Sequence, residues 1–98
     1  VHLGIGAFHR AHQAEYTEDV LECEPGPWRI RGVSLRQPQV RDQLVPQDSL
    51  YTLVERSATG DRLRIVGALD GVLVAPENPA AVLQELERAA TRIVSLTV

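Results

Sequence analysis

The residues of this chain that could do chemistry are concentrated near its beginning, in the segment LGIGAFHRAH at residues 3–12. Gly4 and Gly6 stand one residue apart after a short apolar stretch, and a segment with helical spacing follows. In a strand–turn–helix unit, the first glycine permits a tight turn and the second lets the backbone approach a pyrophosphate at the helix N-terminus. His9 occupies the position of the usual third small residue. By spacing alone, the segment fits a plain turn as well as a nucleotide-binding turn.

A second candidate contact to a dinucleotide is Arg36, which follows the apolar segment VSL at residues 33–35. Rossmann-type sites for NAD place an acidic residue near this point to bind the ribose hydroxyls, but this chain continues as RQPQ at residues 36–39. An arginine here suits the 2′-phosphate of NADP, or it caps the edge of the sheet. The two readings of Arg36 stay open at this level.

The histidines raise two further possibilities, a metal site and proton transfer. His9 and His12 are three residues apart and share a helical face, but a metal site needs more ligands than two, and no cysteine pair or His-Glu-x-x-His spacing accompanies them. The sequence therefore predicts no metal site. An imidazole titrates near neutral pH, so proton transfer remains an alternative. We expect Arg10 and His12 to lie on a helix surface or against another part of a longer protein.

The elements that must position these residues alternate between strand and helix patterns. Strands are predicted at residues 1–5, 28–35, 50–56, 63–68, 71–75 and 92–98, and helices at residues 7–22, 40–44 and 79–90. The two strands around residues 57–62 suit a hairpin with a longer loop. Asn78 is an expected N-cap, and the β-branched run at 92–98 is typical of an interior strand covered on both faces. The fold class is therefore α/β, with a mainly parallel sheet and an inserted β-hairpin.

Composition limits the classes of function. The net charge is -3, and the basic residues are arginines scattered singly, so nothing tracks a nucleic-acid backbone. No apolar run is long enough to span a membrane, and no export signal is present, so we expect no membrane partner and a cytoplasmic location. Cys23 is the single cysteine and is expected to be incidental. Because the chain opens and closes within strand patterns, we expect it to be part of a longer protein.

The whole chain resembles a known family, the polyol-specific long-chain dehydrogenases, which include mannitol 2-dehydrogenases and fructuronate reductases (mannonate oxidoreductases). The similar segments are GIGAFHRAHQAEYTEDVL, RGVSLR, QDSLYTLVER, VGALDGVLVAPENPAAVL and TRIVSLTV, which follow the family's order. The resemblance implies that residues 1–98 are part of an N-terminal NAD(P)-binding Rossmann domain. It also implies a helical C-terminal domain that carries a catalytic lysine with asparagine and histidine partners. This chain has no lysine, so no catalytic residue is predicted within it.

The resemblance further implies a cofactor, a substrate class and a set of contacts. The cofactor is NAD, with NADP left open, and the substrate is a polyol or sugar acid bound against the protein's own C-terminal domain. The alternative is a non-catalytic Rossmann module that senses a dinucleotide or serves a structural role. The predicted cofactor-binding residues are Gly4, Ile5, Gly6, Ala7, Phe8, His9, Arg10, Arg36 and Thr97.

Overall fold

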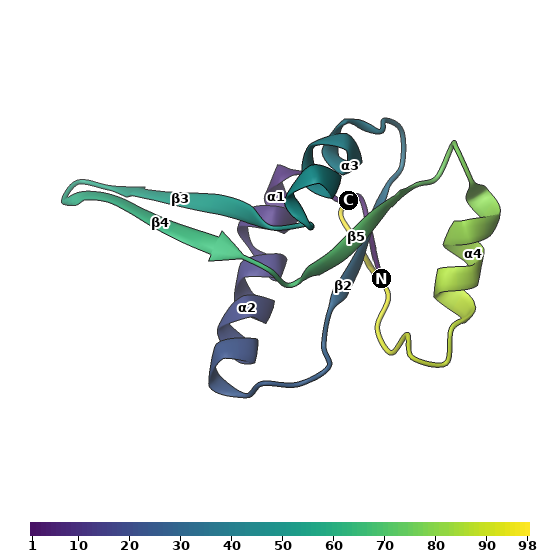
Figure 1. The fold of residues 1–98 in the computed structure, drawn as a ribbon, viewed down its shortest axis with the longest axis horizontal. Helices are drawn as coiled ribbons and strands as arrows, with labels where there is room; N and C mark the ends of the chain where they lie inside the picture. The colour runs from purple at the N-terminus through teal and green to yellow at the C-terminus, as the bar shows by residue number, and fades with distance from the viewer.

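A computed structural model describes residues 1–98 and shows a four-stranded sheet with a separate two-stranded hairpin (Figure 1). The strands are β1 (His2–Leu3), β2 (Ile30–Ser34), β3 (Tyr51–Ser57), β4 (Gly60–Val66), β5 (Leu69–Val74) and β6 (Ser95–Leu96). The helices are α1 (Ala7–Ala11), α2 (Gln13–Cys23), α3 (Gln39–Leu44), the 3-10 turn η1 (Val45–Gln47) and α4 (Pro79–Glu87).

The sheet has the strand order β5-β2-β1-β6, and all its neighbouring strands are parallel. Counted along the chain without the hairpin strands, this order is 3-2-1-4, which is the first part of a Rossmann sheet. The order reverses between β1 and β6. The predicted α/β Rossmann fold with an inserted hairpin is therefore confirmed, and the reversal marks the point where such sheets bind ligands.

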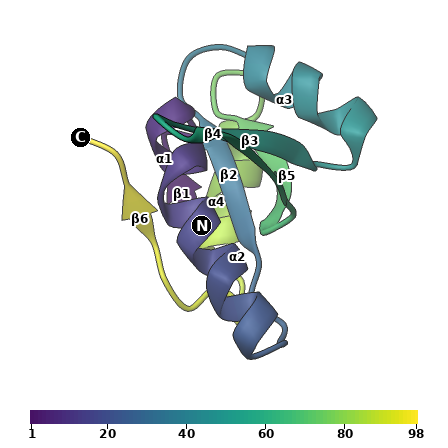
Figure 2. The same ribbon diagram turned by 90° about the vertical axis from the view of Figure 1, so that its left-hand side faces the viewer.

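Helices cover both faces of this sheet, with α2 and α3 on one face and α4 on the other (Figures 1 and 2). On the α3 side, Ile5, Leu44 and Leu69 form a buried apolar cluster with Val72. Gly32 of β2 makes room for this cluster, because a Cβ atom there would lie 2.8 Å from the Ile5 side chain. Ile5, two residues after β1, is thus held by the core as well as by the bond from its amide to the Val33 carbonyl.

The hairpin differs from the expected one in its loop. Ser57 pairs with Gly60, so two residues close the hairpin and the longer loop predicted at residues 57–62 is wrong. The Ser57 hydroxyl donates to the Gly60 carbonyl at 2.8 Å, and Gly60 has a φ of 127°, which lets the chain reverse early. The hairpin projects from the sheet (Figure 1) and is tied to α2 through Arg64, whose guanidinium lies 2.5 Å from the Asp19 carboxylate.

The single helix expected at residues 7–22 is divided at His12. His12 has φ and ψ of -127° and -81°, so α1 ends before it and α2 begins after it. Phe8, Tyr16 and Val20, which are separated by multiples of four residues as on one helical face, are each more than half exposed. His9 and Ala14 are buried instead, because the break changes which side of the segment faces the sheet. Trp28, in the segment between α2 and β2, is also about half exposed.

The end of the chain also differs from expectation. Of the strand predicted at residues 92–98, only Ser95 and Leu96 form β6, which pairs with β1. Within residues 1–98, the side chains of Ile93, Val94 and Leu96 are each more than half exposed. The Asn78 cap is confirmed, since its side chain accepts from the Ala81 amide at 3.1 Å. None of the helices combines the length and apolar character needed to cross a bilayer.

Candidate functional site

A groove of about 370 Å³ lies at the carboxyl edge of the sheet, where β1, β2 and β6 end. It is placed at the reversal of strand order, because its walls come from the turn after β1 and the segment after β6. Open α/β sheets bind ligands at this location. The groove is lined by Gly4, Ile5, Gly6, Ser34, Leu35, Arg36, Gln37, Val40 and Thr97.

The turn after β1 forms one wall of the groove, and its two glycines play different parts. Gly4 has a φ of +97°, a conformation that side-chain-bearing residues rarely adopt, and its amide donates to the Val33 carbonyl at 2.9 Å. Gly6 has an ordinary φ of -83°, and a Cβ atom added to it would meet nothing within 4 Å. Neither the backbone conformation nor the packing requires glycine at position 6, so its open side is free for close approach by a ligand.

Four of the predicted contact residues, Ala7, Phe8, His9 and Arg10, lie in α1 and do not line the groove. The first hydrogen bond of this helix runs from the Arg10 amide to the Gly6 carbonyl at 3.2 Å. The amides of residues 7–9 come before this bond and therefore have no partner within the helix. The Tyr51 hydroxyl donates to the Arg10 carbonyl at 2.5 Å, and burial raises the pKa of Tyr51 to about 12. A tyrosine that stays protonated thus joins the hairpin to α1.

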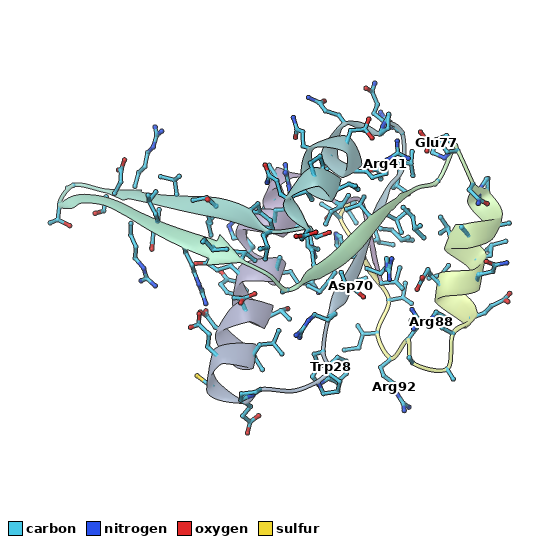
Figure 3. All side chains as sticks on the ribbon, in the orientation of Figure 1. Trp28, Arg41, Asp70, Glu77, Arg88 and Arg92 are labelled. Carbon is cyan, nitrogen blue, oxygen red and sulfur yellow. The ribbon has the colours of Figure 1, made fainter.

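Arg36 supplies a positive charge to the groove, and no carboxylate is among the lining residues. Arg41 of α3 is engaged elsewhere, because it forms ion pairs with Asp42 and Glu77, which raise the pKa of its guanidinium (Figure 3). Arg36 has no such ion pair. An anionic group in the groove would therefore meet the unneutralised charge of Arg36.

The predicted site histidine, His9, is buried against His2 of β1 rather than facing the groove. The two rings are stacked, with centroids 3.8 Å apart and an interplanar angle of 15°. Burial lowers the pKa of both, that of His9 to about 4, so both rings are neutral near pH 7. No group of three or more histidine, cysteine, aspartate or glutamate side chains is placed to hold a metal ion. The stack fills the space where a Rossmann fingerprint usually has a small residue.

A larger cavity of about 520 Å³ lies away from this groove, between α2, α4 and the first residue of the chain. Trp28, Arg88 and Arg92 are among its lining residues (Figure 3). Much of its charge is internally paired, since Arg88 lies 3.0 Å from Glu85. It contains none of the predicted contact residues and borders the amino ends of the strands, so it does not match a Rossmann ligand site.

The structure thus brings Gly4, Ile5, Gly6, Arg36 and Thr97 together, and it adds lining residues that sequence reasoning did not propose. Ser34, Leu35, Gln37 and Val40 belong to the end of β2 and the segment that follows it. Their place at this edge could have been predicted, because the carboxyl ends of parallel strands meet at one edge of the sheet. Their side chains are of ordinary types, however, and did not stand out.

Comparison with known families gives the decisive observation. Residues 1–98 match the model of the mannitol dehydrogenase Rossmann domain. The chain belongs to the mannitol dehydrogenase family. Among curated relatives in this family, mannitol 2-dehydrogenase from Pyrenophora tritici-repentis is 45% identical over 102 residues, covering 100% of this chain and 18% of the relative. Mannitol 2-dehydrogenase from Aspergillus fumigatus is 42% identical and is covered to 20%.

Solved structures of relatives show the same fold. A ternary complex of Pseudomonas fluorescens mannitol 2-dehydrogenase with NAD and D-mannitol superposes with a TM-score of 0.91 and 41% identity, covering 98% of this chain and 20% of that one. A substrate-free D-sorbitol dehydrogenase gives a TM-score of 0.85 and 42% identity, covering 99% and 21%. The chain therefore spans about a fifth of the length of these relatives.

Proposed function

We propose that this chain is the dinucleotide-binding portion of an NAD(P)-dependent oxidoreductase that transfers hydride between the nicotinamide and a secondary alcohol of a polyol or sugar acid. The observation that carries the proposal is the unobstructed Gly6 in a groove at the reversal of strand order. Membership of the mannitol dehydrogenase family and the NAD named for the Pseudomonas fluorescens complex support it.

In this proposal the turn after β1 and the segment after β6 hold the diphosphate of the coenzyme between them. Gly4 gives the turn its shape, Gly6 and Ile5 let the backbone approach the diphosphate, and Thr97 forms the opposite wall. Ala7, Phe8, His9 and Arg10 support the turn from α1 behind it. The nicotinamide supplies the hydride chemistry when it is bound, and the residues of this chain bind and orient it.

NAD is the proposed coenzyme, and the positive charge of Arg36 would allow NADP to bind in the same groove. NAD is what the Pseudomonas fluorescens complex contains. At the end of β2, however, this chain has Arg36 and Gln37 and no lining carboxylate to repel a 2′-phosphate. We therefore expect NADP to bind with measurable affinity, and Arg36→Ala to weaken NADP binding more than NAD binding.

The rest of the proposal concerns the full-length protein. Its substrate is of the mannitol/fructose or mannonate/fructuronate type, and it is bound between this domain and a mainly helical C-terminal domain. That domain supplies the catalytic residues, since none is assigned within residues 1–98. Holding the substrate carbon against the nicotinamide provides much of the rate gain. We place the protein in the cytoplasm.

The test uses the full-length protein in two steps. NADH and NADPH are titrated by the change in nicotinamide fluorescence, and mannitol, arabinitol, mannonate and altronate are then offered with NAD and with NADP. Saturable coenzyme binding and turnover of at least one substrate are expected. Binding without turnover of any substrate would favour a dinucleotide-sensing module, and absence of binding would overturn the proposed function.

A further inference from the structure

The stacked histidines join three elements that meet behind the groove, namely β1, α1 and β6. His2 and His9 are exposed to only 4% and 2%, which is low for polar rings. Neither ring nitrogen of His9 has a hydrogen-bond partner within the chain, and its ring stacks on that of His2. His2 is different, because both of its nitrogens are engaged. The role of His2 therefore depends on the groups that it binds.

The partners of His2 are two hydroxyl groups on the β6 segment. Its Nδ1 lies 2.8 Å from the Ser95 hydroxyl, and its Nε2 lies 2.8 Å from the Thr97 hydroxyl. A neutral imidazole has one donor and one acceptor, and a hydroxyl can serve as either, so both bonds form with either tautomer. Residues two apart in a strand project to the same face, which explains how one ring reaches both.

The bond to Thr97 matters for the groove, because Thr97 is one of its walls. A Cβ atom added to Gly4 would lie 3.6 Å from the Thr97 Cβ, so this side chain rests against the glycine turn. The backbone places the β6 segment beside β1, since the Ser95 amide donates to the Val1 carbonyl at 3.0 Å and the Thr97 amide donates to the Leu3 carbonyl at 3.1 Å. The bond from His2 holds the Thr97 hydroxyl, so it sets the direction of the Thr97 side chain.

We propose that His2 is a positioning residue for the dinucleotide site: its bond to the Thr97 hydroxyl holds the Thr97 side chain in place against the glycine turn. His9 supports the plane of the His2 ring from α1, and the bond to Ser95 anchors the other side of the ring. The inference rests on the proposed function, because its effect is read through coenzyme binding. His2 itself touches no coenzyme and does not line the groove.

The test is a double-mutant cycle in the full-length protein, with NADH affinity and thermal unfolding measured for each variant. His2→Phe keeps a ring to stack on His9 and loses both hydrogen bonds, while Thr97→Val keeps the shape and loses the hydroxyl. Each is expected to raise the Kd for NADH roughly 5- to 10-fold, as the loss of about one hydrogen bond would. The double variant is expected to be no worse than the poorer single variant, because both remove the same bond.

Matched controls separate positioning from a purely structural role. Ser95→Ala removes the other bond of His2 and the bond from the Ser95 hydroxyl to Gln13, and neither residue lines the groove. This variant should leave the Kd within about twofold while lowering Tm. Thr97→Ser keeps the hydroxyl and should restore near-normal affinity. If His2→Phe does not accumulate as folded protein, the contrast between Thr97→Val and Ser95→Ala carries the test, because each removes one of the two bonds of His2.

Three results would overturn the inference. The first is a His2→Phe variant with a lowered Tm and an unchanged Kd. The second is additive losses of affinity in the double variant. The third is an equal effect of Ser95→Ala and Thr97→Val on the Kd. A wild-type protein that binds neither NADH nor NADPH would instead overturn the proposed function, and the inference with it.

Discussion

Replacing Gly6 by alanine should separate coenzyme binding from folding. The substitution adds one methyl group at a position with an ordinary φ of -83° and no neighbouring atom within 4 Å. Removing a glycine limits the unfolded chain and stabilises by about 0.4–1 kcal/mol, while alanine is a poorer N-cap than glycine by a similar amount. These contributions offset each other, so the stability of the fold should change by less than about 1 kcal/mol.

The substitution should instead weaken the binding of the coenzyme. A methyl group on the open side of Gly6 occupies the space through which a diphosphate would approach the backbone. Losing one hydrogen bond to a charged group costs about 1.5–3 kcal/mol. That range corresponds to a rise in Kd of roughly 10- to 150-fold. Gly6→Val, with a larger branched side chain, should weaken binding further.

The assay is fluorescence titration of NADH with the full-length protein, alongside thermal unfolding of the same samples. Gly4→Ala is the informative contrast, because its φ of +97° makes alanine strained there, at a cost of about 1–3 kcal/mol in stability. Gly26→Ala, in a turn remote from the groove, should change neither quantity appreciably. Unchanged NADH affinity in Gly6→Ala would refute the assignment of the coenzyme to this turn. A large loss of stability in Gly6→Ala would refute the conclusion that neither backbone conformation nor packing requires glycine at position 6.

Other substitutions test how the fold supports the groove. Gly32→Ala should destabilise by about 1–3 kcal/mol in thermal unfolding, because the new Cβ overlaps the Ile5 side chain; an unchanged Tm would contradict this packing. Asn78→Ala should cost about 1 kcal/mol by freeing the Ala81 amide, and Asn78→Asp should restore most of it. Because burial lowers the pKa of His9 from 6.5 to about 4, the unfolded chain binds its proton at a higher pH than the folded chain. Stability should therefore fall as the pH drops from about 6.5 to 4, by up to about 3 kcal/mol, and His9→Phe should flatten that dependence in Tm measurements against pH.

The local part of the structure followed well from the sequence, because turns and caps depend on short-range chemistry. Gly4 and Gly6 predicted the turn after β1, and Asn78 with the proline after it predicted the start of α4. The hairpin was expected between the correct strands, but its loop was expected too long. A serine hydroxyl that bonds across the turn closes it after two residues, and residue types alone did not indicate this bond.

The candidate site was predictable in its centre and less so in its surroundings. Gly4, Ile5, Gly6, Arg36 and Thr97 line one groove, as residues at the carboxyl ends of neighbouring parallel strands must. The predicted α1 residues do not line it. Helical spacing assumes an uninterrupted helix, so it did not predict the break at His12.

The sequence by itself determined the class of fold, the glycine turn and the family, since these depend on residue types at fixed short spacings. Only the tertiary structure decided what His2 and His9 do. They are seven residues apart in the chain, and the partners of His2 lie more than ninety residues away. Parallel strand pairing brings these distant positions together, and the exclusion of water makes the stacked rings neutral. His9, which its spacing from His12 raises as a possible metal ligand, is in the folded chain a buried ring stacked on His2.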